Sequence, residues 1–253
     1  MKMRPGVEVA GLSDVGCQRD NNEDSYAYWE PEDDAIFQRL GRLAIVADGM
    51  GGTEGGQHAS RIAVETLLES YQVADSADDP QQRLINAFAD ANASVHHQAQ
   101  ENPALRGMGT TLTAIALVAN RLYFAHVGDS RLYLLQAGEL RRLTHDHSLV
   151  ARLVENGIVR PEDAEKHPQK HVLTAAVGVT DAVQPDVPDE PLSLERGDIL
   201  LLCTDGLWGQ MTDSEIVGLL SSKAPMAACR ALVDLAKAHG GPDNITVQVA
   251  KIV

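Results

Sequence analysis

Aspartate residues at the ends of apolar runs are the groups in this chain best suited to chemistry. Asp48 and Gly49 follow the apolar run 43–47, and Asp205 and Gly206 follow the run 199–204. Such runs predict buried strands that carry a carboxylate to the edge of a sheet. Because glycine has no Cβ, its backbone can approach a ligand closely. Two such pairs, over a hundred residues apart, suggest two sheets that meet at one edge.

Further acidic residues lie at turns and ends of runs. Asp243 precedes the run 245–252, Asp129 lies in a turn, and Glu23 and Asp24 end a polar stretch that contains Arg19. Clustered carboxylates repel one another and need a positive partner. Oxygen ligands without a CxxC pair or regular His spacing select Mg²⁺ or Mn²⁺ rather than Zn²⁺. A carboxylate that bridges two such ions holds them roughly 3.5–4 Å apart, as in phosphoryl-transfer and hydrolytic sites.

A simpler interpretation is that each Asp-Gly pair only marks a turn. That interpretation accounts for any single pair, but it accounts poorly for the whole set together with Arg19.

Composition excludes several classes of protein. The formal charge of -15 over 253 residues argues against binding of nucleic acid or anionic membranes. No apolar stretch approaches the ~20 residues of a membrane span, and no apolar run follows the basic N-terminus as it does in a signal peptide. A cytoplasmic location is therefore expected. Cys17, Cys203 and Cys229 have no disulfide or zinc spacing and are interpreted as small buried apolar residues.

The elements that must position these carboxylates follow from hydrophobic periodicity. Helices are predicted where apolar residues repeat at helical spacing around 64–71, 84–95 and 228–235, and where Thr212 and Glu215 form a capping box. Strands come in consecutive groups, with 110–136 expected as a three-strand meander, which favours an α+β layered sandwich of antiparallel sheets. The irregular segment 145–189 is expected to be a mobile element beside the site. The predicted strands are 7–10, 43–47, 110–118, 122–127, 132–136, 199–204 and 245–252.

Seven stretches, in order along nearly the whole chain, resemble the PP2C-type (PPM) metal-dependent protein serine/threonine phosphatases, and their bacterial branch in particular. They are Ser13-Asp14-Val15-Gly16 with Arg19 and Asn22-Glu23-Asp24-Ser25; Asp48-Gly49-Met50-Gly51-Gly52; Gly109-Thr110-Thr111; Val127-Gly128-Asp129-Ser130-Arg131; Leu143-Thr144 with Asp146-His147-Ser148; Thr204-Asp205-Gly206-Leu207-Trp208; and Asp243-Asn244-Ile245-Thr246.

The resemblance implies one domain over 1–253, with a mobile flap at about 145–189. Its fold would be a four-layer α/β-β/α sandwich, with two antiparallel sheets flanked by helices and a metal centre at one edge. Two Mn²⁺ or Mg²⁺ ions would be bridged by Asp48, with the Gly49 carbonyl on one ion and Asp205 and Asp243 on the other.

The remaining site residues are also implied by the resemblance. Glu23 and Asp24 would hold metal-bound waters, Asp129 would help Asp205 to bind a third, weaker ion, and Arg19 would bind the substrate phosphate. The catalytic set is thus Arg19, Asp48 and Asp205, with direct attack on phosphorus by a water that bridges the metals.

The implied function is hydrolysis of phosphoserine and phosphothreonine on proteins by a monomeric enzyme that opposes a bacterial Ser/Thr kinase. A link to type VI secretion is an analogy based on the compact catalytic domain. Two alternatives stay open: a catalytically weak module that binds phosphoproteins, and a phosphomonoesterase of small molecules.

Four positions depart from the family pattern. Met50 replaces the His that eukaryotic members use as a proposed general acid, and a metal-bound water near Asp129 is the candidate replacement. His126 stands where Asn is usual and is interpreted as a core histidine. Ala175 replaces an Arg of the flap, and His145 is atypical. A metal role for His145 with His147 is disfavoured.

Overall fold

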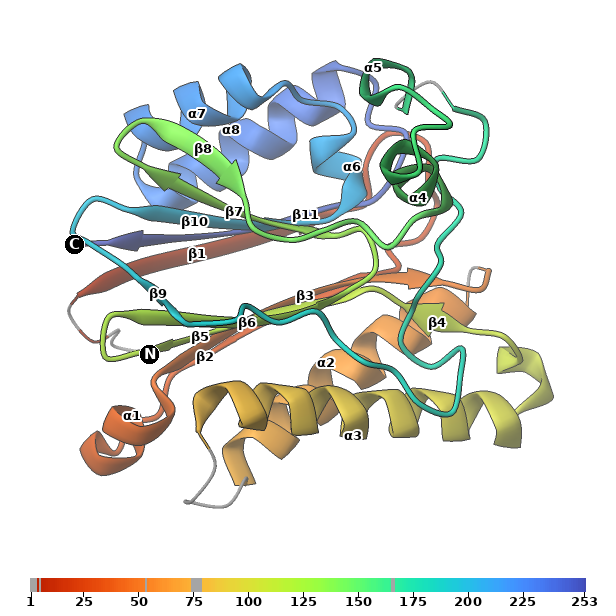
Figure 1. The fold of residues 1–253 in the computed structure, drawn as a ribbon, viewed down its shortest axis with the longest axis horizontal. Helices are drawn as coiled ribbons and strands as arrows, with labels where there is room; N and C mark the ends of the chain where they lie inside the picture. The colour runs from red at the N-terminus through yellow and green to blue at the C-terminus, as the bar shows by residue number, and fades with distance from the viewer. Residues whose placement is uncertain (1–3, 5, 53, 74–78, 165–166) are drawn as a thin grey trace.

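Two antiparallel sheets lie face to face in the computed structural model, which describes residues 4, 6–52, 54–73, 79–164 and 167–253 (Figure 1). In order, the first sheet contains β1 (Val7–Asp14), β11 (Ile245–Ile252), β10 (Ile199–Cys203), β7 (Arg131–Gln136) and β8 (Glu139–Arg142). The second contains β2 (Asp24–Trp29), β3 (Arg42–Met50), β5 (Leu112–Val118), β6 (Arg121–Val127) and β9 (Leu192–Ser193), with β4 (Gly109–Thr110) paired to the end of β3.

Helices cover the outer faces of both sheets (Figure 1). The long helices α2 (Gly55–Val73) and α3 (Pro80–Glu101) lie on the second sheet, and α7 (Asp213–Ser222) and α8 (Pro225–Ala238) lie on the first. The expected four-layer α+β sandwich is therefore confirmed. The shorter helices are α1 (Asp34–Leu40), the 3₁₀ helix η1 (Pro103–Leu105), α4 (Leu149–Glu155), α5 (Pro161–Ala164) and α6 (Asp205–Trp208).

Three apolar layers hold the sandwich together. Val46, Ile115 and Leu202 belong to the layer between the two sheets. Phe88 lies in the layer between the second sheet and its helices, and Leu232 lies in the layer between the first sheet and α8. Strands buried on both faces explain why the sequence shows continuous apolar runs rather than strict alternation.

The predicted three-strand meander over 110–136 is wrong in its third strand. β5 and β6 pair as expected, but β7 pairs with β10 and β8 in the other sheet. The chain crosses between the sheets at Gly128, whose positive φ of 109° and tight fit against Thr111 suit glycine. A turn that looks like a hairpin in the sequence is thus a change of sheet, and it leaves Asp129 at the edge where both sheets end.

Local signals in the sequence agree with the helix starts. Thr212 caps α7, and the capping box with Glu215 is complete. Asp79 caps α3, with Pro80 at the first helical position. Within the described ranges, none of the helices combines the length and apolar character that a membrane span requires.

The segment 145–189 carries α4 and α5 and otherwise has little regular structure. Its expected mobility stays a prediction. Cys203 and Cys229 are buried as expected, but Cys17 is exposed, so the interpretation of all three as buried apolar residues is wrong for Cys17.

Candidate metal centre

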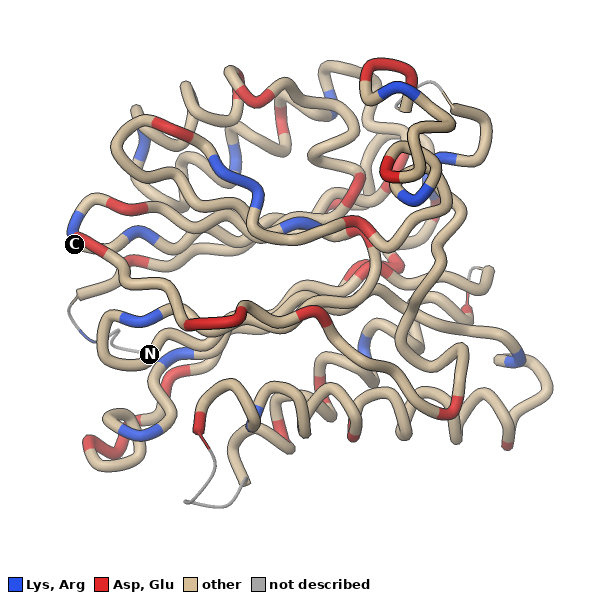
Figure 2. Tube along the Cα trace, viewed as in Figure 1, with Lys and Arg blue, Asp and Glu red and all other residues tan. Residues whose placement is uncertain are grey.

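Acidic residues from both sheets gather at one edge of the sandwich, as the red positions in Figure 2 show. They surround a cleft of about 420 Å³. Seven of the eight predicted site residues line it, and Asp24 lies buried next to Asp48 rather than on the cleft wall. The lining residues are Arg19, Glu23, Asp48, Gly49, Met50, Gly51, Gly52, Thr111, Asp129, His171, Leu173, Asp205, Asp243 and Asn244.

Asp48 is fixed by its neighbours on both sides of β3. The β2–β3 register places Asp24 directly opposite it. The Asp48 backbone N–H donates to Thr111 Oγ1 at 2.9 Å, and its carbonyl accepts from Thr110 Oγ1 and from the Thr111 N–H, both at 2.8 Å. These bonds hold the backbone that carries the carboxylate, so the position of Asp48 depends on the junction of β4 and β5.

The backbone of Gly49 packs where no side chain fits. A Cβ at this position would lie 2.0 Å from the carbonyl oxygen of Gly56, at the start of α2. The Gly49 N–H donates to the carbonyl of Glu23 at 3.1 Å. Gly56 in turn is close to the Glu23 carboxylate, since a Cβ there would lie 2.5 Å from Glu23 Oε2. The start of α2, Gly49 and Glu23 therefore form one close-packed unit.

Arg19 lies against the acidic cluster and pairs with one of its members. Its Nη2 donates to Asp243 Oδ2 at 2.8 Å, while the Asn244 N–H donates to Asp243 Oδ1 at 2.8 Å. Asn244 Oδ1 accepts from the Glu23 N–H, also at 2.8 Å, which links the residues just before β11 to those just before β2. The hydrogen bond to Asp243 is the main cause of the raised pKa of Arg19, whose side chain is 51% exposed. An exposed guanidinium at this place can reach an incoming anion.

Burial and mutual repulsion disfavour ionisation of these carboxyls. Burial is the largest cause in each case, and the neighbouring carboxylates add to it. The pKa of Asp24 rises to about 7, the pKa values of Asp48 and Asp129 rise well above their ordinary value, and that of Glu23 is also raised. Arg19 is the only Lys or Arg among the residues that line the cleft. Such a site favours added positive charge.

The residues present fit divalent cations. Asp24 Oδ1 and Asp205 Oδ1 are buried and have no hydrogen-bond partner among the described residues. Buried carboxylate oxygens without a donor are costly unless a cation or water satisfies them. Every acidic group at the cleft offers hard oxygen ligands, which suit Mg²⁺ or Mn²⁺.

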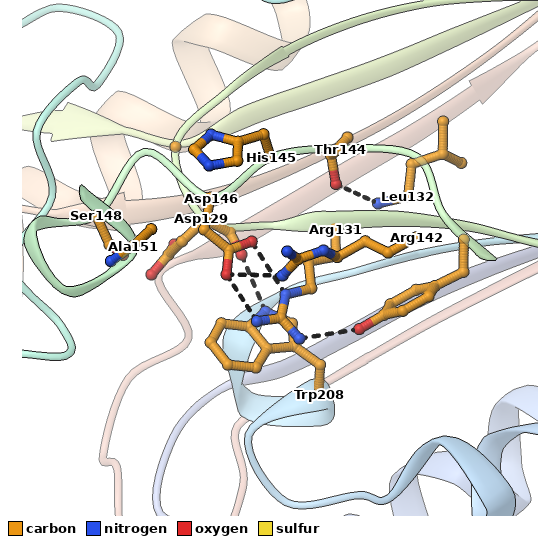
Figure 3. A network of polar contacts seen from close by, with 12 residues as sticks. Asp129, Arg131, Leu132, Arg142, Thr144, His145, Asp146, Ser148, Ala151 and Trp208 are labelled. Atoms are coloured by element: carbon orange, nitrogen blue, oxygen red, sulfur yellow. Dashed lines mark hydrogen bonds and ion pairs between the residues drawn. The ribbon is translucent and has the colours of Figure 1, made fainter. Parts of the chain in front are cut away.

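Asp129 is connected to Asp205 by a contact that the sequence did not predict. The indole Nε1 of Trp208 donates to the Asp129 carbonyl at 3.0 Å, and Trp208 ends the same short helix, α6, that Asp205 begins. Arg131 stacks on the Trp208 ring at 3.5 Å and binds Asp146 at 3.0 and 2.6 Å (Figure 3). These contacts fix the backbone of Asp129 relative to that of Asp205.

His126 is a buried histidine with its hydrogen bonds satisfied, as predicted. Nδ1 lies 2.8 Å from Thr113 Oγ1, and Nε2 lies 3.0 Å from the carbonyls of Gly128 and His145. Burial lowers its pKa to about 4, and the nearby His147 contributes.

His145, His147 and Asp186 bring three potential ligand atoms within 4.8 Å of one another. The hydrogen bonds account for these groups without a metal. The Gly128 N–H donates to His147 Nδ1 at 3.2 Å, which leaves the proton on Nε2, and Nε2 lies 3.0 Å from Asp186 Oδ2. His145 pairs instead with Glu155 at 2.6 Å. The interpretation that disfavours a metal role for the two histidines stays a prediction.

The chain is an α+β protein in which two antiparallel sheets lie between layers of helices and an acidic cleft lies at one edge of the sheets. The protein phosphatase 2C family matches residues 18–238. The chain belongs to this family.

Relatives of the chain agree over nearly its full length. Protein phosphatase PhpP of Streptococcus pneumoniae is 38% identical over 250 residues, which is 97% of this chain and 98% of that protein. The catalytic domain of serine/threonine protein phosphatase PstP in complex with two manganese ions has a TM-score of 0.84 and 35% identity, and the match covers 98% of this chain and 99% of that one. PppA, described as a key regulatory component of the T6SS in Pseudomonas aeruginosa, has a TM-score of 0.81 and 34% identity, over 98% of each chain.

Proposed function

We propose that this chain, a protein serine/threonine phosphatase by its family, hydrolyses phosphoserine and phosphothreonine on proteins with the help of two Mn²⁺ or Mg²⁺ ions and a third, weaker one. The observation that carries the proposal is the single cleft that joins buried, unpartnered carboxylate oxygens to an exposed arginine. The relative crystallised with two manganese ions supports the same assignment.

The proposed ligands come from separate elements. Asp48 and Gly49 lie near the end of β3, Asp205 begins α6, and Asp243 precedes β11. When bound, the cations supply Lewis-acid activation of water and of the phosphoryl group. Glu23 and Asp24 would hold water near the cations, and Asp129 with Asp205 would provide the weaker third site.

The chain's own residues bind and orient the phosphate. Arg19 can reach the phosphoryl oxygens with two parallel donors, which Lys cannot do. Its contact with Asp243 keeps the guanidinium at the cleft wall before substrate arrives. Met50 lines the cleft, and a thioether cannot donate a proton to the leaving oxygen, so that proton comes from solvent beside Asp129.

The test is hydrolysis of p-nitrophenyl phosphate and of phosphothreonine and phosphotyrosine peptides with Mn²⁺, Mg²⁺ or EDTA. We expect turnover of the small ester and the phosphothreonine peptide that EDTA abolishes, and loss of both in Asp243→Asn. Calorimetry should show weakened Mn²⁺ binding by Asp243→Asn, while its circular dichroism spectrum stays that of the wild type. Near-normal activity of this variant would remove the assignment of the metal ligands.

The same assay separates the two alternatives. A protein that binds phosphopeptide but shows no turnover with Mn²⁺ is a binding module. A protein that hydrolyses only the small ester is a small-molecule phosphomonoesterase.

A physiological role against a Ser/Thr kinase is part of the proposal, and the similarity to PppA supports a T6SS setting. Comparison of phosphoproteomes with and without the gene tests it, because the substrates of the opposing kinase should gain phosphate. The expectations of a monomer and of a cytoplasmic location stay predictions.

A further inference from the structure

A second cavity, here called the flap-side pocket, lies beside the metal cleft. It has a volume of about 410 Å³ and an apolar wall. That wall consists of Val150, Ala151 and Val154 on α4, Pro161 and Ala164 on α5, and Trp208 at the end of α6.

The flap-side pocket adjoins the metal cleft. Asp129 lines both cavities, and Lys170 of the pocket is followed directly in the chain by His171 of the cleft. An extended peptide advances about 3.3 Å per residue. A polypeptide whose phosphorylated residue enters the cleft can therefore reach the pocket with a side chain a few residues away.

The polar floor of the pocket is already satisfied by internal contacts. Arg131 donates to both oxygens of Asp146 and to the Tyr133 hydroxyl at 3.0 Å, and it stacks on Trp208 (Figure 3). Arg142 pairs with the same carboxylate at 3.1 Å. Asp146 pairs with both cations, and the carboxyl groups of Asp129 and Glu155 also line the pocket, so the floor offers little attraction to an anion, whereas the wall offers apolar surface.

The segment that forms the wall also exposes apolar groups to solvent. Ile158, just after α4, is 70% exposed, and Val172, beside His171, is 46% exposed. Neither residue lines the pocket itself, but exposed apolar groups on the same segment add to the apolar surface that a polypeptide could contact.

We propose that the flap-side pocket binds an apolar side chain of the substrate protein, a few residues from the phosphorylated residue. The proposal rests on the proposed phosphatase function, since it assigns the substrate's flanking sequence. A small ester such as p-nitrophenyl phosphate has no chain that extends several residues from its phosphate, so the pocket discriminates only among peptides and proteins.

The test uses phosphothreonine peptides in which Leu or Ser occupies each position within four residues of the phosphothreonine. We expect one position at which Leu raises kcat/KM on the order of tenfold, since filling an apolar pocket gives discrimination of this size. Ala151→Trp fills the pocket and should remove that preference. Arg152→Trp introduces the same side chain at an exposed position of α4 outside the pocket and should keep the preference. Hydrolysis of p-nitrophenyl phosphate should be unchanged in both variants.

A second variant tests the pocket independently in case Ala151→Trp does not fold. Val154→Thr keeps the shape of the side chain but places a hydroxyl on the wall, and it should reduce the Leu preference. Equal kcat/KM for Leu and Ser at every position, or a preference that survives both pocket variants, would overturn the proposal. Absence of all metal-dependent hydrolysis by the wild type would instead refute the proposed function, so the two failures are distinguishable.

Discussion

Asp24→Asn should stabilise the metal-free protein at neutral pH. Asp24 is only 8% exposed and lies opposite Asp48 in the β2–β3 pair. Its Oδ2 accepts from Thr204 Oγ1 at 2.9 Å, and its Oδ1 has no partner among the described residues. Burial is the main cause that raises its pKa to about 7, and the nearby Asp205 and Asp243 contribute.

The sign follows from proton linkage. In the unfolded chain Asp24 ionises near the ordinary value of 3.8, whereas the folded metal-free protein keeps the proton up to a pH of about 7. The folded state is therefore penalised progressively between these two values. Because one pKa unit corresponds to about 1.4 kcal/mol, the penalty from this carboxyl reaches at most about 4 kcal/mol above pH 7. An asparagine carries no such penalty, and removal of the Asp24 charge also relieves the repulsion on Asp48.

Urea denaturation in EDTA from pH 4.5 to 8 measures this penalty. The free energy of unfolding of the wild type should fall as the pH rises, and that of Asp24→Asn should fall less, so that the variant is the more stable protein at pH 7.5 by about 1–4 kcal/mol. Asp20→Asn, at an exposed position in the same polar stretch, is the matched control and should follow the wild type.

Mn²⁺ should reverse the order, since the carboxylate then favours binding of the cation and the asparagine does not. Parallel pH curves for Asp24→Asn and the wild type in EDTA would refute the reasoning. They would mean that Asp24 is hydrated in the folded protein and titrates near its ordinary pKa.

Two further changes test groups away from the cleft wall. Burial lowers the pKa of His126 to about 4, so the wild type should lose stability as the pH falls from 6.5 towards 4, by up to about 3 kcal/mol. His126→Asn should flatten the acid side of a plot of Tm against pH, and an unchanged acid slope would contradict this. Glu30→Gln removes the charge that pairs with buried Arg42 at 2.6 Å and should cost about 3 kcal/mol in the free energy of unfolding from urea titrations. A cost below about 1 kcal/mol would show that the other contacts of Arg42 compensate for the lost charge.

The fold was predictable from the sequence where one face or both faces of an element are apolar. The strand 245–252 was predicted at its observed limits, because the continuous run Ile245 to Ile252 is buried almost throughout. α7 was predicted from the capping box of Thr212 and Glu215, which is a purely local signal. Such elements can be predicted from their own residues alone.

β2 was missed because its pattern is mixed. It runs from Asp24 to Trp29, and Asp24 is its only buried residue, so it contains no apolar run from which a strand could be predicted. β8, at the edge of the first sheet, consists of charged residues apart from Leu140. Edge strands of this kind are defined by the neighbour that they pair with, and periodicity along the chain does not reveal the neighbour.

The prediction that placed β7 in the wrong sheet failed for a different reason. The stretch 122–136 has the spacing of a hairpin, and loop length alone does not tell a hairpin from a change of sheet. What decides the outcome is packing: Leu132 and Leu134 point into the layer between the sheets, where they meet Leu200 and Leu202 of β10. That contact joins residues nearly seventy positions apart, so no pattern within a short stretch of the sequence predicts it.

The site itself was predictable as a set of residues and not as a geometry. Resemblance identified which carboxylates belong together, whereas the contacts that hold them join opposite ends of the chain. Arg19 meets Asp243 across 224 positions, and Glu23 meets Asn244 across 221. These two contacts link the loop before β2, in the second sheet, to the residues just before β11, in the first sheet. The cleft therefore exists only once both sheets have formed and packed together, so tight Mn²⁺ binding requires the complete sandwich and neither half should reproduce it alone.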